Sequence, residues 1–233
     1  MKHSNFYKVQ QFKIRCSAIG QIMTEPRSKS ETLSETCKGY IETWVKEGIY
    51  DRRKDFISKY TNKGNSVEDD AIEYLGDVRG TMYVKNVQWH DNDYMTGTPD
   101  IVTSNVVIDI KSSWDCFTFP LFDTVIDKKY WWQLQGYMAL TGRKQAELVY
   151  VLMNTPEEII EKEARSLNGW EDPSLELYEE VANRMRYDNF SSELRVKTFV
   201  IDADEAAHEA IKQRVIACRE YINTNFNLNN QPK

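Results

Sequence analysis

Apolar positions in the first third of the chain recur at helical spacing in two places. Residues 30–47 place Leu33, Tyr40 and Trp44 on one side of a helix, and residues 67–77 repeat this pattern with a shorter apolar stripe. Gly80 follows the second stripe, at a position where glycine readily ends a helix. The pattern therefore predicts two helices before the first strand.

A run of extended segments follows. Alternating or continuous apolar residues predict strands over 82–87, 94–102 and 106–111. The polar triplets at 91–93 and 103–105 are typical of the turns that join such strands. The middle of the chain is therefore expected to form a sheet.

The second half of the chain returns to helices. A helix is predicted over 128–140, and Gly142 lies where it would end. The continuous apolar segment 146–153 predicts a buried strand. Two acidic helices are expected after it, over 156–167 and 174–187.

The last two elements are a strand over 195–201 and a helix that ends near Asn223. Asp202 resembles the N-cap of this helix, because Glu205 follows three residues later. The order of elements predicts an α/β fold with a central mixed β-sheet flanked by helices. We expect residues 1–233 to form a single domain.

Composition narrows the class of protein. The 233 residues are 41% hydrophobic and 28% charged, with 10 Gly and 6 Pro, which is typical of a globular domain. The sequence contains no stretch of about 18 apolar residues, which a membrane-spanning helix would need. Residues 1–15 lack the apolar core of a secretory signal. A cytoplasmic protein without a membrane partner is therefore expected. The four cysteines form no CxxC pair and are expected as reduced thiols.

Charge is distributed unevenly along the chain. The net charge is −6, but residues 1–65 hold 13 basic and 7 acidic residues, a net of +6. Residues 66–233 hold 17 basic and 29 acidic residues, a net of −12. A basic N-terminal third permits a surface that faces phosphates. Solvated helix faces that differ by chance would give the same totals.

The informative chemistry lies in Asp100 and in the tripeptide Asp109-Ile110-Lys111. Side chains alternate along a strand, so Asp109 and Lys111 are expected on the same face. Asp100 lies across a short turn and can reach the same end of the strand. Two carboxylates beside an ammonium group suit a hard divalent cation. An exposed edge strand or a structural ion pair would also explain an isolated Asp-x-Lys sequence.

A third carboxylate is expected from the helix that precedes the strands. Glu68 is the first candidate, and its neighbours Asp69, Asp70 and Glu73 are alternatives. Acidic residues also favour helix starts for purely electrostatic reasons. One acid directed from this helix at the end of the sheet would complete a site of three carboxylates.

The joint occurrence of these residues resembles the PD-(D/E)xK nuclease superfamily. The central match is Pro99-Asp100 followed by Asp109-Ile110-Lys111. Asp109 stands where many members of the superfamily have Glu, so its shorter side chain requires a closer approach to a metal.

Three further segments carry the same resemblance. Glu68 matches the helix acid of the exonuclease branch, and Gln133 with Tyr137 matches its QxxxY motif. Residues 15–20 (RCSAIG) resemble the entry motif of lambda-type phage exonucleases and YqaJ-type viral recombinases. The matching elements together cover residues 15–137.

The resemblance implies a restriction-endonuclease-like core that hydrolyses phosphodiester bonds. It makes Glu68, Asp100 and Asp109 ligands of one or two Mg²⁺ (or Mn²⁺) ions, together with the backbone carbonyl of Ile110. It gives Lys111 the role of orienting or deprotonating the attacking water. The expected catalytic residues are therefore the three acids and this lysine. Bound cations would also offset the acidic charge that repels DNA.

Five residues are expected to contact DNA. Arg15 and Ser17 suit a terminal phosphate, and Ser112 follows Lys111 closely enough to reach backbone phosphates. The resemblance places Gln133 beside the metal site and Tyr137 one turn further along. The alternatives are a helix N-cap for Ser17, a turn residue for Ser112, and helix packing for Gln133 and Tyr137.

The expected function is that of a metal-dependent exonuclease that degrades double-stranded DNA, from 5′ ends, in phage-type recombination. The resemblance also implies a homotrimer and a single-strand annealing protein as partner. The alternatives are an endonuclease of the same fold and a catalytically idle DNA-binding protein. The motif-bearing core is expected over about 15–153, with additions over 154–225 and a loose tail over 226–233.

Overall fold

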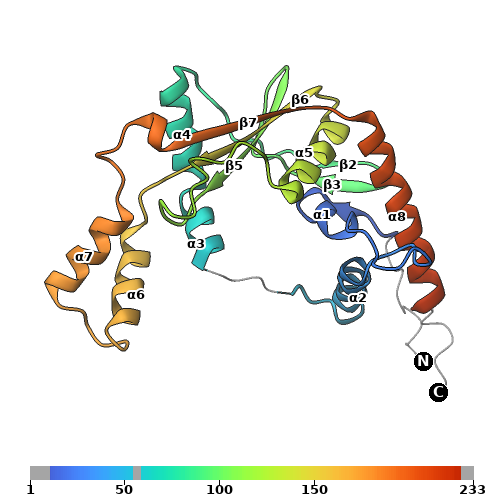
Figure 1. The fold of residues 1–233 in the computed structure, drawn as a ribbon, viewed down its shortest axis with the longest axis horizontal. Coiled ribbons are helices and arrows are strands. Elements are labelled where there is room, and N and C mark those ends of the chain that lie inside the picture. The colour runs from blue at the N-terminus through green and yellow to red at the C-terminus, as the bar shows by residue number, and fades with distance from the viewer. Residues whose placement is uncertain (1–10, 55–58, 227–233) are drawn as a thin grey trace, which may run out of the picture.

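A computed structural model describes residues 11–54 and 59–226 of the chain. This part is a mixed α/β fold, in which helices flank a central sheet (Figure 1). The predicted fold class is therefore confirmed. The predicted loose tail lies, except for its first residue, outside the described residues.

The central sheet has the strand order β4-β5-β6-β7. β5 (Val106–Ser112) and β6 (Gln145–Val151) run parallel in its middle. β4 (Ile101–Val102) and β7 (Val196–Asp202) are their antiparallel neighbours at the two edges. α5 (Lys128–Thr141) connects β5 to β6, as a parallel pair requires.

Alternation along β5 divides the core into two faces. Ile110 packs on the face that α4 (Glu68–Arg79) covers. Val107 points the other way and packs in the larger cluster that contains α5. Burial of both apolar faces fixes the register of the strand. It therefore also fixes the face on which Asp109 and Lys111 lie.

A second, three-stranded sheet joins the N-terminal region to the middle of the chain. β1 (Ile14–Arg15) pairs in parallel with β3 (Met95–Gly97), and β3 pairs in antiparallel with β2 (His90–Asp91). The short helices η1 (Cys16–Ala18) and α1 (Ile19–Ile22) follow β1 and contact α5. The entry motif therefore lies against the helix that carries the QxxxY motif.

α2, α3 and α4 lie in the chain between α1 and residue 80, before the strands β2 to β7. α2 (Glu35–Tyr50) begins at Ser34, whose hydroxyl accepts a hydrogen bond from the Cys37 N–H. α3 (Lys59–Ser66) leads directly into α4. The left-handed backbone of Gly80 (φ 60°) ends α4. The positions of α2 and α4, and the end of α4 at Gly80, agree with the sequence prediction.

α6 (Glu157–Leu167) and α7 (Leu175–Met185) form a helical hairpin that projects from the sheet (Figure 1). Their facing side chains share a separate apolar cluster with Trp114, which follows β5 in the chain. The short helix η2 (Ser192–Leu194) then leads into β7. Both predicted acidic helices are therefore confirmed.

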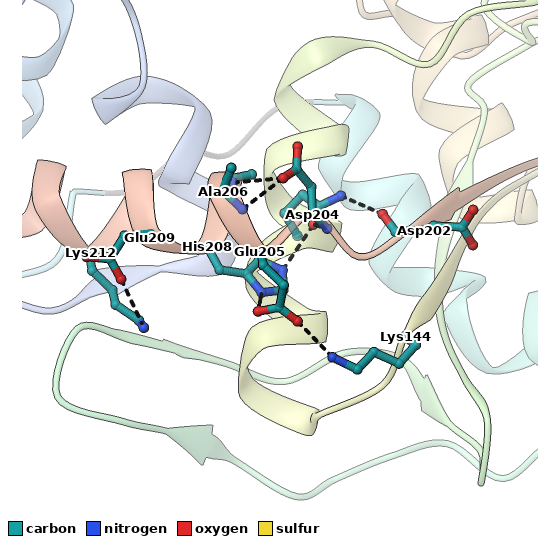
Figure 2. Close-up of polar contacts among 10 residues, drawn as sticks. Lys144, Asp202, Asp204, Glu205, Ala206, His208, Glu209 and Lys212 are labelled. Carbon is teal, nitrogen blue, oxygen red and sulfur yellow. Dashed lines mark hydrogen bonds and ion pairs between the residues drawn. The ribbon is translucent and has the colours of Figure 1, made fainter.

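The last helix, α8 (Glu205–Asn225), begins at Asp204 and not at Asp202. Figure 2 shows the Asp204 carboxylate at the start of the helix, where it accepts hydrogen bonds from the N–H groups of Ala206 and Ala207. The prediction of an N-cap at Asp202 is wrong because β7 extends through that residue. The chain first leaves the strand conformation after it.

Two strand predictions are also wrong. Residues 82–87 form no strand, and the side chains of Met82 and Val84 are exposed. The predicted strand over 94–102 is two strands, β3 and β4, that belong to different sheets. Pro99 lies between them, and its missing N–H cannot take part in a strand ladder.

In residues 11–54 and 59–226, no helix combines the length and the apolar character that crossing a membrane requires. Cys16, Cys37 and Cys218 are buried free thiols, whereas the thiol of Cys116 is exposed.

Gly136 allows α5 to approach η1 and α1 closely. A Cβ atom at this position would lie 2.4 Å from Ile19 Cδ1 and 2.9 Å from Cys16 Sγ. We expect Gly136→Ala to lower the free energy of unfolding by about 1–3 kcal/mol, because the extra methyl overpacks the core. Denaturant titration measures this change, and an unaltered midpoint would contradict the close packing.

Gly39→Ala is the matched control. Gly39 lies inside α2, and nothing lies within 4 Å of the Cβ it would gain. This substitution should raise the free energy of unfolding by about 0.5–1 kcal/mol, because alanine loses less backbone freedom than glycine on folding.

Candidate active site

β5 carries two opposite charges on the face that α5 covers, a buried carboxylate and a half-buried ammonium group. Asp109 is 1% exposed, and Lys111 Nζ lies 2.6 Å from its Oδ2. Its other oxygen, Oδ1, accepts a hydrogen bond of 2.9 Å from Gln133 Nε2. The prediction that Asp109 and Lys111 share a face is confirmed. Because an unpaired buried carboxylate is costly, these two partners make its burial possible.

Gln133 and Tyr137 lie one turn apart on α5 and hold this carboxylate in place. Gln133 Nε2 contacts both Asp109 Oδ1 and the Tyr137 hydroxyl oxygen, the latter at 3.1 Å. The Tyr137 hydroxyl in turn donates to the carbonyl of Thr98, at the break between β3 and β4. One chain of contacts therefore links the QxxxY motif to both acidic segments.

The expected role of Gln133 and Tyr137 as DNA contacts does not fit this geometry. Each residue is only 5% exposed, and their polar atoms are engaged with Asp109, with Thr98 and with one another. A DNA strand would find almost no accessible surface on them. We therefore assign them as positioning residues for Asp109.

Asp100 follows the break between β3 and β4 and reaches across to β5. Its Oδ2 accepts a hydrogen bond of 2.6 Å from the Ile110 N–H, between Asp109 and Lys111. Burial, together with the charge of Asp109, raises the pKa of Asp100 to about 7, although Lys111 opposes this shift.

The same charges act on Lys111. Burial lowers the pKa of its ammonium group, but the attraction of Asp109 and Asp100 outweighs burial and holds the pKa above its ordinary value. The two acids and the lysine therefore form one electrostatic unit, in which each charge depends on the other two.

A cavity of about 540 Å³ lies beside this unit. Asp100, Ile110 and Lys111 form part of its wall, and Glu68 reaches it from the first turn of α4. Asp109 lies behind this wall, since it is almost fully buried. Hydroxyl and aromatic groups complete the lining, among them Ser112, Ser113, Trp114, Thr118, Tyr130 and Tyr150.

Glu68 shares the cavity with Asp100, but its carboxylate is engaged elsewhere. Glu68 Oε1 lies 3.0 Å from Lys85 Nζ, which also pairs with Asp69 at 2.7 Å. In residues 11–54 and 59–226, no group of three or more His, Cys, Asp or Glu is arranged to hold a metal ion. Within this described part the three carboxylates do not form such a group, and Glu68 is paired with Lys85.

The alternatives to Glu68 fit less well. Asp69, Asp70 and Glu73 are all exposed, and none of them lines the cavity. Helix geometry explains this difference, since α4 turns these side chains away while Glu68 lies at its first position.

Arg15 and Ser17 do not line the cavity, although they flank Cys16 in the chain. Both are exposed, whereas Cys16 between them is buried, and burial together with the charge of Asp109 raises the pKa of its thiol. Ser17 is not an N-cap, because α1 follows Ala18 and no side chain caps it. The Ser17 side chain is thus available to a ligand, whereas the Arg15 guanidinium group also interacts with the Tyr40 hydroxyl.

Sequence reasoning missed the two tyrosines in the cavity wall. Tyr150 is the register partner of Lys111 in the β5–β6 pair, and its ring packs edge-on against that of Tyr130. Lys111 Nζ lies 5.5 Å from the centre of the Tyr130 ring. The position of Tyr130, three residues before Gln133 on the same helix, is a signal that could have found it.

Comparisons with known proteins supplement this geometry. No family model matches the sequence, and no curated protein matches it. A phage-related exonuclease from Haemophilus somnus matches with a TM-score of 0.77 and 29% identity, over 93% of this chain and 96% of that one. The resemblance to phage-type exonucleases is confirmed.

A second solved structure shares the fold of this chain. The alkaline exonuclease LHK-Exo from Laribacter hongkongensis matches with a TM-score of 0.65 and 15% identity, over 93% of this chain and 90% of that one. Both matches extend well beyond residues 15–137, so the fold similarity also includes segments outside the motifs.

The donor set of the site fits a hard divalent cation. Asp109 Oδ2 is buried 2.6 Å from Lys111 Nζ, so one ammonium group faces two nearby carboxylates, those of Asp109 and Asp100. Burial raises the pKa of half-buried Asp100, and the negative charge of Asp109 adds to this rise because the two acids repel one another. A cation between them would relieve this repulsion, and carboxylate and carbonyl oxygens are the ligands that Mg²⁺ prefers.

Asp100→Asn tests this arrangement without an activity assay. At about pH 8, where Asp100 is ionised, the metal-free variant should unfold at a temperature equal to or above that of the wild type, because one of two repelling acids is removed. Mg²⁺ should raise the unfolding temperature of the wild type and not that of the variant. Calorimetry measures both effects.

Asp70→Asn is the control, because Asp70 is an exposed acid on the same helix as Glu68. It should respond to Mg²⁺ as the wild type does. Equal stabilisation of Asp100→Asn and wild type by Mg²⁺ would remove Asp100 from the cation site.

Proposed function

We propose that this protein is a metal-dependent exonuclease that hydrolyses the phosphodiester bonds of double-stranded DNA. The observation that carries the proposal is the ion pair of buried Asp109 with half-buried Lys111, with Asp100 joined to the same strand, beside an open cavity. The match to the Haemophilus somnus exonuclease, over nearly the full length of both chains, supports the same activity.

Asp100 and Asp109 are the proposed principal ligands of one or two Mg²⁺ or Mn²⁺ ions. The carbonyl of Ile110 and, once separated from Lys85, the carboxylate of Glu68 would complete the ligand set. When bound, the cation stabilises negative charge on the attacking and leaving oxygens of the phosphodiester.

Lys111 acts on the attacking water. Its ammonium group is in the cavity wall, on the same strand as Asp109, and can donate a hydrogen bond to a water or to a phosphate oxygen. The water oxygen attacks phosphorus and gives up a proton to the surrounding water, and the bond from phosphorus to the leaving sugar oxygen breaks as that oxygen takes up a proton. Gln133 and Tyr137 contribute by holding Asp109 in the orientation that the lysine requires.

Arg15, Ser17 and Ser112 are the proposed contacts to the DNA backbone. Ser112 lines the cavity next to Lys111, so its hydroxyl is suited to the phosphate that flanks the cleaved bond. Arg15 and Ser17 are exposed on either side of Cys16, and they are the proposed ligands of a terminal phosphate, to which a guanidinium group can donate two parallel hydrogen bonds. This arrangement favours cleavage that starts at a 5′ end.

A related structure agrees with a nucleotide ligand. LHK-Exo is known in complex with dAMP, a deoxynucleoside monophosphate of the kind an exonuclease releases. A homotrimer and a single-strand annealing protein as partner are further proposals, which rest on the family resemblance.

Lys111→Met tests the role of the lysine. We expect a loss of at least about 100-fold in the cleavage rate, because the group that orients the water is removed. Binding of duplex DNA should be largely kept, since the phosphate contacts at Arg15, Ser17 and Ser112 remain. Stopped-flow cleavage and fluorescence anisotropy measure the two quantities.

Lys212→Met is the matched control, because Lys212 lies on α8 and pairs with Glu209 on the same helix (Figure 2). Its cleavage rate should equal that of the wild type. Undiminished cleavage by Lys111→Met would overturn the role given to Lys111.

Linear and covalently closed circular duplexes separate an exonuclease from an endonuclease. With Mg²⁺, the protein should release mononucleotides from the linear duplex and leave the circle intact. A 5′-phosphorylated linear duplex should be degraded faster than its 5′-hydroxyl form if Arg15 binds the terminal phosphate. Gel analysis measures both comparisons, and breakage of the circle would favour the endonuclease alternative.

A further inference from the structure

The loop after β5 holds an aromatic side chain out in solvent beside the cavity. Phe117 is 93% exposed, and it lies between Trp114 and Thr118, which both line the cavity. Full exposure of a phenyl ring gives up the stabilisation that its burial would provide. Phe117 itself does not line the cavity, but its place in the chain next to Thr118 makes the exposed ring available to a ligand at the edge of the site.

The loop is built to keep this ring in place. The Thr118 N–H donates to Asp115 Oδ1 at 2.8 Å, and the Asp115 N–H donates to Thr118 Oγ1 at 3.0 Å. These reciprocal bonds close a tight turn with Phe117 in its outer part. The ring is therefore presented by a defined turn and does not belong to an open, unstructured segment.

Contacts on both sides of the turn anchor it to the rest of the protein. The Cys116 N–H donates to the Tyr187 hydroxyl at 3.2 Å. On the other side, Phe119 is buried in a small cluster with Leu152 and Tyr187. Within four residues, one phenylalanine thus anchors the loop while the other, Phe117, is left accessible.

We propose that Phe117 is a stacking platform for an unpaired base of the DNA strand that enters the cavity. The inference rests on the proposed function and deepens it, since it names unpaired nucleotides at a duplex end as the ligand. A base stacks on an aromatic ring whatever its sequence, which suits an enzyme that degrades a strand nucleotide by nucleotide. The hydroxyl of Thr118, next to Phe117, lines the cavity that the backbone of the same strand would occupy.

A second exposed phenylalanine provides the comparison within the same loop. Phe122 is 89% exposed, but it lies beyond the buried anchor Phe119 and is not flanked by cavity-lining residues. A docking surface for another protein would use both exposed rings. A base platform at the cavity requires Phe117 alone.

The test uses Phe117→Leu, Phe117→Trp and Phe122→Leu, each combined with Lys111→Met so that the DNA is not cleaved. The probe is a short duplex with an unpaired tail that contains 2-aminopurine, whose fluorescence falls when it stacks. Phe117→Leu should bind this probe at least about fivefold more weakly and lose the fluorescence decrease on binding. Phe117→Trp should keep both properties, and Phe122→Leu should match the parent. A blunt duplex should show no difference among the variants.

Equal affinity and equal quenching in Phe117→Leu and its parent would overturn the proposal. Equal weakening by Phe117→Leu and Phe122→Leu would overturn it as well, in favour of a general apolar surface. A change in sedimentation of Phe117→Leu without a change in DNA binding would assign the ring to a protein contact instead. Cleavage of linear duplex by the wild type is measured separately, so a failed stacking test leaves the proposed nuclease function standing.

Discussion

Asp109 is a carboxylate buried between the central sheet and α5, and the surrounding structure depends on how its charge is satisfied. Lys111 lies two residues away on the same strand face and pairs with this carboxylate. Gln133 on α5 donates a hydrogen bond to the Asp109 carboxylate from the other side. Tyr137 extends this chain of contacts to the carbonyl of Thr98. Asp100, two residues later, accepts a hydrogen bond from the Ile110 N–H of β5. The parallel β5–α5–β6 unit thus serves both to build the core and to hold charged groups at a cavity wall.

Much of the fold follows from the sequence because local and long-range preferences agree there. The periodic stripes of α2, α4 and α5 and the apolar runs of β5 and β6 appear where the pattern places them. Prediction failed where the partner of a segment decides its structure. Residues 82–87 have the alternation of a strand but pair with no neighbouring strand. Asp202 is of a residue type that often forms a helix N-cap, yet β7 continues through it.

The candidate site was predictable to the extent that strand geometry determines it. Alternation along β5 gives the shared face of Asp109 and Lys111, and a short connection brings Asp100 to the same strand. The engagement of Glu68 by Lys85 could not be read from the sequence, because it depends on a loop of irregular course. The burial of Gln133 was equally hidden, since a motif does not state which atoms its side chains contact. The place of Tyr150 in the cavity wall could not be predicted, because it depends on the register of β5 and β6, which pairs Tyr150 with Lys111.

We propose that Asp100 and Asp109 hold a divalent cation beside β5. The most direct measurement is the anomalous scattering of Mn²⁺ in crystals of the wild-type protein grown or soaked with that ion. The account predicts a peak about 2.1 Å from a carboxylate oxygen of each residue, with the carbonyl of Ile110 as a further ligand. A Mn²⁺ peak that lies elsewhere, or the lack of any peak in this cavity at saturating Mn²⁺, would contradict it.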